Sequence, residues 1–311
     1  LATDGNGRWC QLNPRVGAMH AVAEAARNVA ASGARPIAAT NCLNFGSPEK
    51  PDVMWQFSEV IDGLTVACNE LGTPITGGNV SLYNETLGKS IYPTPVIGIL
   101  GVLEDASRVL KIAFRGDGDV ILLLDGSESS STSERAQHAA PQQDNQLNGR
   151  ACEFSSSEYS KTIAGIVSGE PPAIDLAAEK RLIDCLVALA SEGSVQSAHD
   201  ISDGGIAVTV AESCFAMDGL GARVSLEDDD FAELALFGER GARCVVSVLP
   251  TKLAAVLATA RQYSVGARQI GKVHLGSAFR IEYKGSAIVD APLDALRSSW
   301  ANSLESTLSA K

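Results

Sequence analysis

The sequence predicts an α/β to α+β fold built from two successive units. In the first hundred residues, apolar side chains recur at helical spacing over 19–33 and 53–72. A short apolar run that is typical of a strand follows each of them, at 35–40 and 73–76. The later part of the chain opens with the continuous apolar run 119–126, which predicts a buried strand. The chain has 311 residues and 45% hydrophobic content, so it is long enough for two such cores.

The first unit contains two well-marked helix ends and two polar segments. Gly33 and Gly72 stand just past the helical patterns, where a residue in the left-handed conformation commonly ends a helix. A further apolar run at 94–104 predicts a buried strand. The polar segments 41–51 and 77–81 each follow a strand that comes after a helix. We therefore expect two loops at the same edge of one sheet, where they line a common site.

The second unit is expected over 106–311, after a first unit at 1–105. Apolar residues almost disappear over 126–150, which predicts a mobile surface loop inside this unit because strands lie on both sides of it. A helix is expected from Asp175 as its N-cap to Gly193 as its end. Further strands are expected at 244–250 and 279–285, and further helices from Ile206, at 251–263 and at 294–306.

Charge and hydropathy exclude some classes of partner. The formal net charge is −12, and an acidic surface repels phosphate backbones, so we expect no binding to nucleic acid. A nucleotide in a local pocket is still allowed, because backbone N–H groups and a metal ion supply a positive field there. No apolar run reaches the length that spans a bilayer and no signal peptide is visible, so we expect a cytoplasmic protein without membrane contact.

The seven cysteines form no C-x-x-C pair, and most lie within apolar helix or strand patterns. We interpret them as reduced core residues of an intracellular protein, not as metal ligands or nucleophiles. The chain opens on Leu1 in the middle of a pattern, which suggests a piece of a longer protein.

The stretch "TGGNVSLYNET" contains the first candidate site. Gly77 and Gly78 allow a backbone to approach a ligand closely. The amide oxygen of Asn79 suits a hard cation, and the hydroxyl of Ser81 can donate to an anion. Phosphate is the ligand that such a segment suggests first. A tight turn with no ligand fits the same residues, so the pattern alone leaves both interpretations open.

Two other polar segments are equally ambiguous. Asn41 and Asn44 follow a predicted strand, where they are either ligand contacts or ordinary turn residues. His199, Asp200 and Asp203 precede a predicted helix. They are candidates for an anion site at a helix N-terminus, a metal set without a second histidine, or a plain N-cap. The acidic run 227–230 is interpreted as a solvated loop.

Taken together, these segments resemble one enzyme family. The runs "NCLNFGSPEKPDVMWQFSEVIDGL", "GTPITGGNVSLYNET" and "AHDISDGGIAVTVAESCF" resemble phosphoribosylformylglycinamidine synthase, also called formylglycinamide ribonucleotide amidotransferase. "GEPPAIDLAAEKRL" and "LFGERGARCVVSV" fit the same family in the same order. The resemblance is to the carboxy-terminal half of the synthetase subunit of the small bacterial type. It covers essentially the whole chain.

The resemblance implies a fold. The family's synthetase subunit consists of two tandem aminoimidazole ribonucleotide synthetase-like units. Each unit has an A domain, a mixed sheet with helices, and a larger α+β B domain. Residues 1–105 match an A domain that carries the ATP site and pairs with another A domain, and 106–311 match a B domain.

The resemblance also implies roles for single residues. Gly78 would contact ATP through its backbone, Asn79 would be a Mg²⁺ ligand and Ser81 would contact formylglycinamide ribonucleotide. A further nucleotide-contacting position, usually aspartate, is Asn41 in this chain, where the amide keeps an acceptor oxygen but lacks the charge. The turn Glu239-Arg240-Gly241 replaces the usual Glu-Ser-Gln, which changes any anion pocket there.

The implied activity is that of an ATP-dependent carbon–nitrogen ligase of purine biosynthesis. It converts formylglycinamide ribonucleotide and glutamine-derived ammonia to the amidine, with ATP and Mg²⁺. The implied partners are the amino-terminal half, a glutaminase subunit and a small accessory subunit. The isolated chain is expected to form a homodimer through its A domain.

No catalytic residue is assigned in this chain, because its four histidines do not match the family's motifs: His20, His138, His199 and His274. We therefore expect the chain by itself to be inactive. The alternative is a non-catalytic half-module that docks the first half and the partner subunits.

Overall fold

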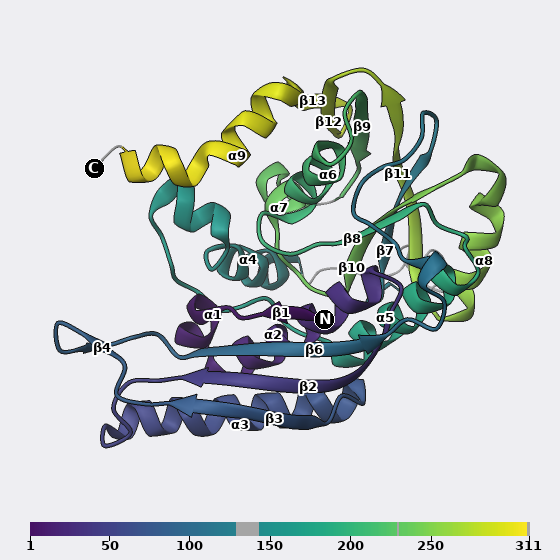
Figure 1. Cartoon of the computed structure of the whole chain (residues 1–311). Helices are drawn as coiled ribbons and strands as arrows, with labels where there is room; N and C mark the ends of the chain where they lie inside the picture. Colours follow the sequence, from purple (N-terminus) through teal and green to yellow (C-terminus); the bar gives the residue numbers. More distant parts are fainter. Residues whose placement is uncertain (129–142, 229, 310–311) are drawn as a thin grey trace.

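The computed structural model describes residues 1–128, 143–228 and 230–309, and it contains two main sheets with helices packed on them (Figure 1). The smaller sheet comprises strands from the first hundred residues, and the larger one comprises strands from residue 120 onward. Both the mixed sheet with helices and the larger α+β part agree with the fold class predicted from the sequence.

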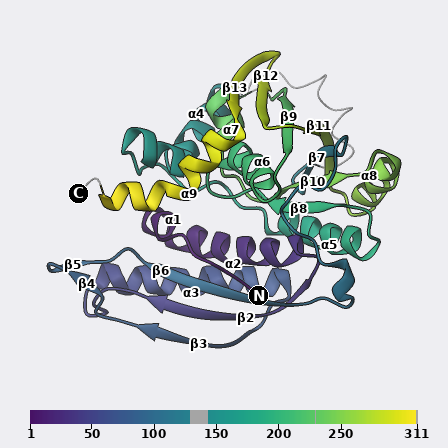
Figure 2. The same cartoon turned by 45° about the horizontal axis from the view of Figure 1, so that its top comes forward.

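The first sheet has four strands in the order β1-β6-β2-β3. Its strands are β1 (Ala2–Asp4), β2 (Arg35–Asn44), β3 (Ile75–Ser81) and β6 (Thr94–Val102). The helices of this part are α1 (Gly7–Leu12), α2 (Pro14–Ala31) and α3 (Pro51–Leu71). Figure 2 shows α2 and α3 side by side on one face of the sheet. The short hairpin β4 (Glu85–Thr86) and β5 (Lys89–Ser90) projects from its end.

The second sheet has seven strands in the order β13-β12-β9-β11-β7-β10-β8. Its strands are β7 (Val120–Asp125), β8 (Ser197–Asp200), β9 (Leu220–Leu226), β10 (Arg243–Val248), β11 (Gly266–Leu275), β12 (Ala278–Tyr283) and β13 (Ser286–Pro292). All neighbours are antiparallel except β12 and β9. The helices are α4 (Gln143–Phe154), α5 (Leu176–Ser191), α6 (Gly205–Phe215), α7 (Ala232–Phe237), α8 (Leu253–Gln262) and α9 (Leu293–Ser309).

The two faces of this larger sheet belong to different cores. Leu122 and Leu124 of β7 pack with α5 and α8, in a cluster that also contains the apolar face of α2. Ile121 and Leu123 point the other way, into a cluster with α6 and α7. This alternation follows from the period of two along a strand. One apolar core therefore runs from the first sheet through α2 and α5 to the second sheet, and it fixes how the two parts sit together.

The predicted helix ends are confirmed. Gly33 and Gly72 have φ of 89° and 67°, just past α2 and α3. The Asp175 side chain accepts a hydrogen bond from Ala178 N at the start of α5, and Gly193 follows its end with φ of 61°.

Two loop predictions are wrong in part. Residues 41–44 continue β2, and 77–81 form most of β3. Asparagine and glycine are tolerated there because the two strands pair with each other and satisfy their backbone groups. The loop prediction for 126–150 is wrong at its end, since 143–150 belong to helix α4. The stretch 129–142 of that prediction lies outside the described residues.

The cysteine interpretation holds for most positions. All seven are free, and five are buried, whereas Cys42 is half-buried and Cys152 is exposed. Among the helices of the described ranges, none combines the length and apolar character needed to cross a membrane.

Candidate functional site

The residues singled out by the sequence lie on two neighbouring parallel strands. In the register between β2 and β3, Asn41 is opposite Gly78 and Asn44 is opposite Ser81. Asn79 stands between them, opposite Cys42. The expectation that the two polar segments meet is therefore confirmed, although they meet as paired strands and not as loops. β3 is the edge strand of this sheet, so in residues 1–128, 143–228 and 230–309 only one of its sides is paired.

The two asparagines lie on opposite faces of this sheet. Asn41 lies two residues from the buried Ala39 and two from the buried Leu43, so all three side chains share one face of β2. That face is the side of the sheet covered by helices. A Cβ on Gly78 would lie 2.2 Å from the Asn41 Oδ1, so only glycine fits beside this amide. Gly77 has nothing within 4 Å of the corresponding position. The second glycine of the pair is thus required by packing, and the first is not.

Asn79 and Ser81 face the open side of the sheet, by the same alternation. Asn79 is exposed. The Ser81 hydroxyl is half-buried and lies 3.3 Å from the Asn84 Oδ1, and the Asn84 amide donates to the Ser81 backbone oxygen at 3.0 Å. Asn84 therefore holds the end of β3 in place and fixes the direction of the serine.

This open face carries apolar side chains that no part of the chain covers within the described ranges. Leu100 and Val102 of β6 are each 49% exposed, on the side opposite to the buried Ile97 and Ile99. The candidate residues Asn79 and Ser81 thus belong to a broad sheet face that is partly apolar.

The residues at β3 fit a metal ion only as a partial set. An amide oxygen is a normal Mg²⁺ ligand, and the Asn79 side chain is free to turn toward one. In the described part of the chain, no group of three or more histidine, cysteine, aspartate or glutamate side chains is arranged to hold a metal. A magnesium at Asn79 therefore needs its other ligands from ATP, water or another part of the protein.

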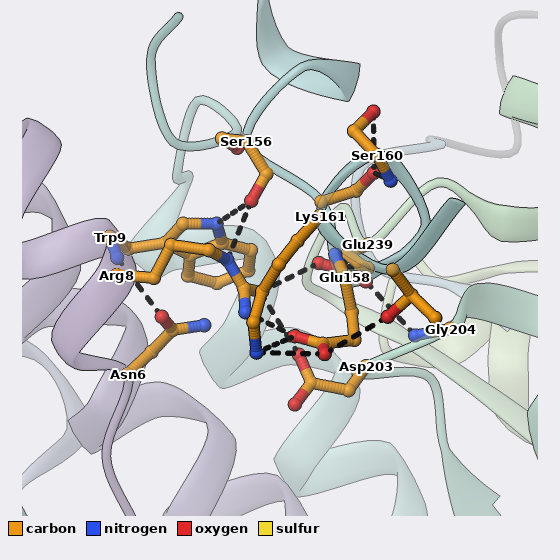
Figure 3. Close-up of polar contacts among 12 residues, drawn as sticks. Asn6, Arg8, Trp9, Ser156, Glu158, Ser160, Lys161, Asp203, Gly204 and Glu239 are labelled. Atoms are coloured by element: carbon orange, nitrogen blue, oxygen red, sulfur yellow. Dashed lines mark hydrogen bonds and ion pairs between the residues drawn. The ribbon is translucent and has the colours of Figure 1, made fainter. Parts of the chain in front are cut away.

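A second polar cluster centres on Arg8 of α1 (Figure 3). Sequence reasoning named its members Asp203 and Glu239 but missed Arg8 and Glu158. Arg8 Nε donates to the Ser156 backbone oxygen at 2.8 Å, and its Nη1 pairs with Glu158. The Arg8 Nη2 lies 3.4 Å from both Asp203 and Glu239. One arginine of the first part thereby contacts three separate segments of the second. The only sequence signal nearby was Asn6, which caps α1 by accepting a hydrogen bond from Trp9 N at 3.0 Å.

Glu239 is the most buried member of this cluster, with 1% of its side chain exposed. Its Oε1 accepts hydrogen bonds from Glu158 N at 2.8 Å and from Gly204 N at 3.0 Å. Burial, together with the charge of Asp203, raises the pKa of Glu239 to about 7, and the backbone hydrogen bonds and Arg8 act against this. A cavity of about 540 Å³ lies beside the cluster, between the residues after β1 and Lys161.

The rest of the Glu239-Arg240-Gly241 turn is used structurally. Arg240 pairs with Asp125 at the end of β7. A Cβ at Gly241 would lie 2.4 Å from the Glu179 Oε1, so this glycine makes room for a buried carboxylate. Arg240 and Gly241 of this turn are therefore engaged in packing inside the second unit.

The three residues of "AHDISDGG" do not form one site. Asp200 is buried 3.7 Å from the Arg27 guanidinium, whereas Asp203 lies at Arg8. His199 Nδ1 lies 3.2 Å from the Thr209 oxygen and its Nε2 3.5 Å from Glu212. The N-cap of α6 is Gly204, without a side-chain cap, so the N-cap interpretation of these residues is wrong.

Two of the other histidines, His20 and His274, have described neighbours. His20 is buried against Trp9, with ring centroids 4.7 Å apart, and its Nε2 lies 2.7 Å from the Pro172 oxygen. Burial lowers the pKa of His20. His274 is next to its own chain's Leu275 oxygen, and His138 lies outside the described residues.

Comparison with known proteins decides the family. The model of the AIR synthase related protein N-terminal domain matches residues 1–103, and that of the AIR synthase related protein C-terminal domain matches 116–284. This chain belongs to the AIR synthase related protein family. The second match alone covers more than half of the chain.

The curated relatives agree with the resemblance seen in the sequence. The chain is 41% identical over 300 residues to the phosphoribosylformylglycinamidine synthase subunit PurL of Caldanaerobacter subterraneus. The aligned stretch covers 96% of this chain and 38% of that protein. It is 46% identical over 288 residues to PurL of Thermobifida fusca, 93% of this chain and 34% of that protein. The chain thus spans little more than a third of the length of these relatives.

Solved structures show the same fold. T. maritima PurL complexed with FGAR superposes with a TM-score of 0.73 at 21% identity, covering 95% of this chain and 45% of that one. T. maritima PurL complexed with ATP gives 0.68 at 21% identity, covering 95% and 43%. A chain of the HypE-HypF complex gives 0.61 at 16% identity, covering 93% and 89%. The predicted fold class is confirmed.

Proposed function

We propose that this chain is the carboxy-terminal half of a PurL-type synthetase subunit that works in purine biosynthesis in the cytoplasm. The enzyme is a carbon–nitrogen ligase that joins ammonia to formylglycinamide ribonucleotide at the expense of ATP. The relatives carry the name of that activity, and solved PurL structures contain FGAR, ATP or ADP.

The observation that carries this proposal is the pairing of β2 with β3. It places Gly78, Asn79 and Ser81 in sequence along an unpaired sheet edge, beside Asn41. An edge strand presents free backbone donors, and a glycine at its centre lets a phosphate chain approach them. The same segment is therefore able to bind a nucleotide by its backbone and to offer two side chains on one face.

Each residue has a defined task in this proposal. The Gly78 backbone contacts the phosphates, and the Asn41 amide, half-buried beside it, contacts the nucleotide from the helix side. The Asn79 oxygen is one ligand of Mg²⁺, and the Ser81 hydroxyl donates to the formylglycinamide ribonucleotide. Bound Mg²⁺ would neutralise charge on the phosphates during phosphoryl transfer. In this proposal the residues of this chain orient the reactants, and none of them acts as a general base.

The remainder of the site comes from the amino-terminal half in this proposal. Asn79 supplies a single neutral ligand, and a magnesium between phosphates needs more oxygen ligands than that. The open sheet face with Leu100 and Val102 is the surface on which the first half's A domain packs. When the first half is missing, a second copy of this chain covers the same face as a homodimer. The glutaminase subunit and the small accessory subunit complete the enzyme.

A second candidate is a half-module without a nucleotide, whose task is to dock the first half and the partner subunits. Asn41 favours it, because an amide lacks the charge of the usual carboxylate and binds a metal poorly. The turn at 239–241 favours it as well, since Glu239, Arg240 and Gly241 are engaged in internal packing.

Calorimetry separates the two candidates. ATP with Mg²⁺ is titrated into the full-length enzyme and into the variant Gly77→Val, at a position where a Cβ has nothing within 4 Å. The ligase proposal expects saturable binding by the parent and strongly weakened binding by the variant, because the added side chain stands on the same face as Asn79. Equal binding by both proteins would place the nucleotide elsewhere and favour the docking module.

A further inference from the structure

Asn84 lies in the turn between β3 and the β4–β5 hairpin, three residues after Ser81 (Figure 1). Its amide nitrogen is within hydrogen-bond distance of three oxygens. They are the Ser81 backbone oxygen at 3.0 Å, the Phe45 backbone oxygen at 3.1 Å and the Ser81 Oγ at 3.1 Å. One side chain thus reaches the ends of β2 and β3 and the serine hydroxyl to which the proposed function assigns a substrate contact.

The two backbone oxygens determine how the Asn84 amide is oriented. A carbonyl oxygen only accepts hydrogen bonds, so the amide nitrogen and not the amide oxygen has to face Ser81 O and Phe45 O. Exchanging the two ends of the amide would place an oxygen against two oxygens. The orientation is therefore set by the fold and needs no bound ligand.

Phe45 connects this turn to the core of the first unit. Its side chain is 1% exposed and meets Phe57 edge-on, with ring centroids 5.1 Å apart. The Phe45 backbone oxygen also accepts a hydrogen bond from Asn84 N at 3.0 Å, and Phe45 N donates to the Ser81 oxygen at 3.0 Å. Because a close-packed aromatic side chain has little freedom to move, Asn84 is tied to a rigid part of the molecule.

The backbone of Tyr83 brings Asn84 back toward β2. Tyr83 has a φ of 60°, which is unfavourable for a bulky residue other than glycine. Its N–H donates to the Gly46 oxygen at 2.9 Å, directly beside the contacts that Asn84 makes with Phe45. The hydrogen bonds on both residues therefore maintain a strained turn that places the Asn84 amide next to Ser81.

The contact with Asn84 affects what the Ser81 hydroxyl is able to donate. A hydroxyl group has one hydrogen and can also accept hydrogen bonds on its oxygen. When Asn84 Nδ2 donates to Ser81 Oγ at 3.1 Å, the hydroxyl hydrogen stays available for a ligand. The alternative, donation from Ser81 to the Asn84 Oδ1, spans 3.3 Å and is the longer of the two contacts. A ligand oxygen has only this longer contact to displace.

We propose that Asn84 is a positioning residue for the ribonucleotide: its amide donates to the Ser81 Oγ and leaves the hydroxyl hydrogen free to donate to that substrate. This inference rests on the proposed role of Ser81 and deepens it. Asn84 acts through the serine and does not itself contact the substrate. Its loss should therefore affect the ribonucleotide and not ATP with Mg²⁺.

The test measures the steady-state kinetics of the full-length enzyme and its variant Asn84→Ala, with ammonia supplied directly. The KM for formylglycinamide ribonucleotide should rise about 10-fold, as expected when a hydrogen bond to a ligand loses its geometry. The KM for ATP with Mg²⁺ should change by less than about twofold, because Gly78 and Asn79 keep their pairing with β2. A purely structural role would move the whole end of β3 and raise both KM values together.

A double-mutant cycle shows whether Asn84 acts through Ser81. Ser81→Ala should raise the KM for the ribonucleotide, and adding Asn84→Ala to it should raise that KM no further, since the hydroxyl is already gone. Arg181→Met is the matched control. It removes two donors to the Gly126 backbone oxygen in the second unit and should leave both KM values unchanged.

Thermal melting confirms that each variant is folded. If Asn84→Ala does not fold, Asn84→Asp takes its place. This side chain has the same size, and its carboxylate accepts the Ser81 hydroxyl hydrogen that the substrate needs, so the KM for the ribonucleotide should again rise about 10-fold.

Three results overturn the proposal: an unchanged KM for the ribonucleotide in the Asn84 variant, an equal rise for ATP, or a further rise in the double variant. If Ser81→Ala keeps the parent KM, the role of Ser81 in the proposed function fails as well. If Ser81→Ala raises the KM and the Asn84 variant does not, only the inference about Asn84 fails. Calorimetry with ATP tests the nucleotide site independently of both residues.

Discussion

Arg27 of α2 donates a hydrogen bond of 2.7 Å to Glu179 of α5, and both side chains are almost completely inaccessible, at 2% and 1% exposed. The pair joins α2, which packs on the first sheet, to α5, which packs on the second. Glu179 Oε1 also accepts a hydrogen bond from Ala242 N at 2.8 Å, and Asp200 lies 3.7 Å from the same guanidinium. An ionic contact in an apolar core thus fixes the position of the two units.

Removing the cation from this core should be strongly destabilising. Arg27→Met leaves Glu179 and Asp200 buried without a counter-ion, which costs about 3–5 kcal/mol of unfolding free energy. The double variant Arg27→Met with Glu179→Gln should recover part of the loss, because the amide keeps an acceptor without a charge. Urea denaturation measures the unfolding free energy of the single and the double variant. Arg35→Met is the control, because its partner Asp184 lies 3.7 Å away and the Arg35 side chain is 60% exposed. It should cost less than about 1 kcal/mol.

Glu239 should make stability depend on pH. Its folded pKa of about 7 lies above its unfolded value, so the folded state holds the proton more tightly. The resulting stabilisation is complete below pH 4.5 and is lost as the pH rises through 7. Glu239→Gln removes this titration, so the difference in unfolding free energy between parent and variant should change by up to about 3 kcal/mol between pH 5 and 8. Equal pH profiles for parent and variant, with the exposed Glu233→Gln as reference, would show that Glu239 is ionised throughout.

Asn79 should bind magnesium through its side-chain oxygen in the full-length enzyme. Asn79→Ala removes one oxygen ligand from an exposed strand position, so the fold should survive. Turnover should fall by on the order of 10- to 1000-fold, or roughly 1.4–4 kcal/mol of transition-state stabilisation. Part of this loss should return at high magnesium. Asn79→Asp keeps an oxygen and adds charge, so it should retain or tighten metal binding. If both variants keep full activity across a magnesium titration, the metal assignment fails.

The 311-residue chain by itself should form a homodimer through the first sheet. The apolar side chains on its open face need a cover when the first half is missing. Sedimentation equilibrium at high micromolar concentration measures the mass. Leu100→Glu places a charge in the middle of that face and should give a monomer, whereas Leu275→Glu, at an exposed apolar residue of β11, should not. A parent chain that sediments as a clean monomer contradicts the expectation.

The same chain should make no amidine, even with ammonia supplied directly. In the proposed site it would provide one neutral ligand for magnesium, and the described residues contain no cluster that holds a metal by itself. The assay follows ATP- and ammonia-dependent product formation, with the full-length enzyme as positive control. Measurable turnover by the pure 311-residue chain would falsify the division of the site between the two halves.

Much of the fold followed from the sequence because its signals are local. Helical spacing of apolar residues and a glycine past the last turn specify α2 and α3, and the Asp175 side chain caps α5 through a hydrogen bond three residues away. Such contacts are formed within one turn of the chain, so the residues themselves report them. The family was evident for the same reason, since its motifs are continuous.

The tertiary structure decided which residues meet. Residues 41–44 and 77–81 contain turn-forming residues, yet they are strands because pairing between β2 and β3 outweighs local preference. Arg8 contacts Glu239, 231 residues away, and Arg27 contacts Glu179, 152 residues away. No local pattern encodes contacts over such separations, because they depend on how the first and second units pack together. The sequence alone predicted most of the helices and strands and proposed the candidate residues Asn41, Gly78, Asn79 and Ser81. Only the packed fold placed Asn79 and Ser81 on the open face and Asn41 on the other.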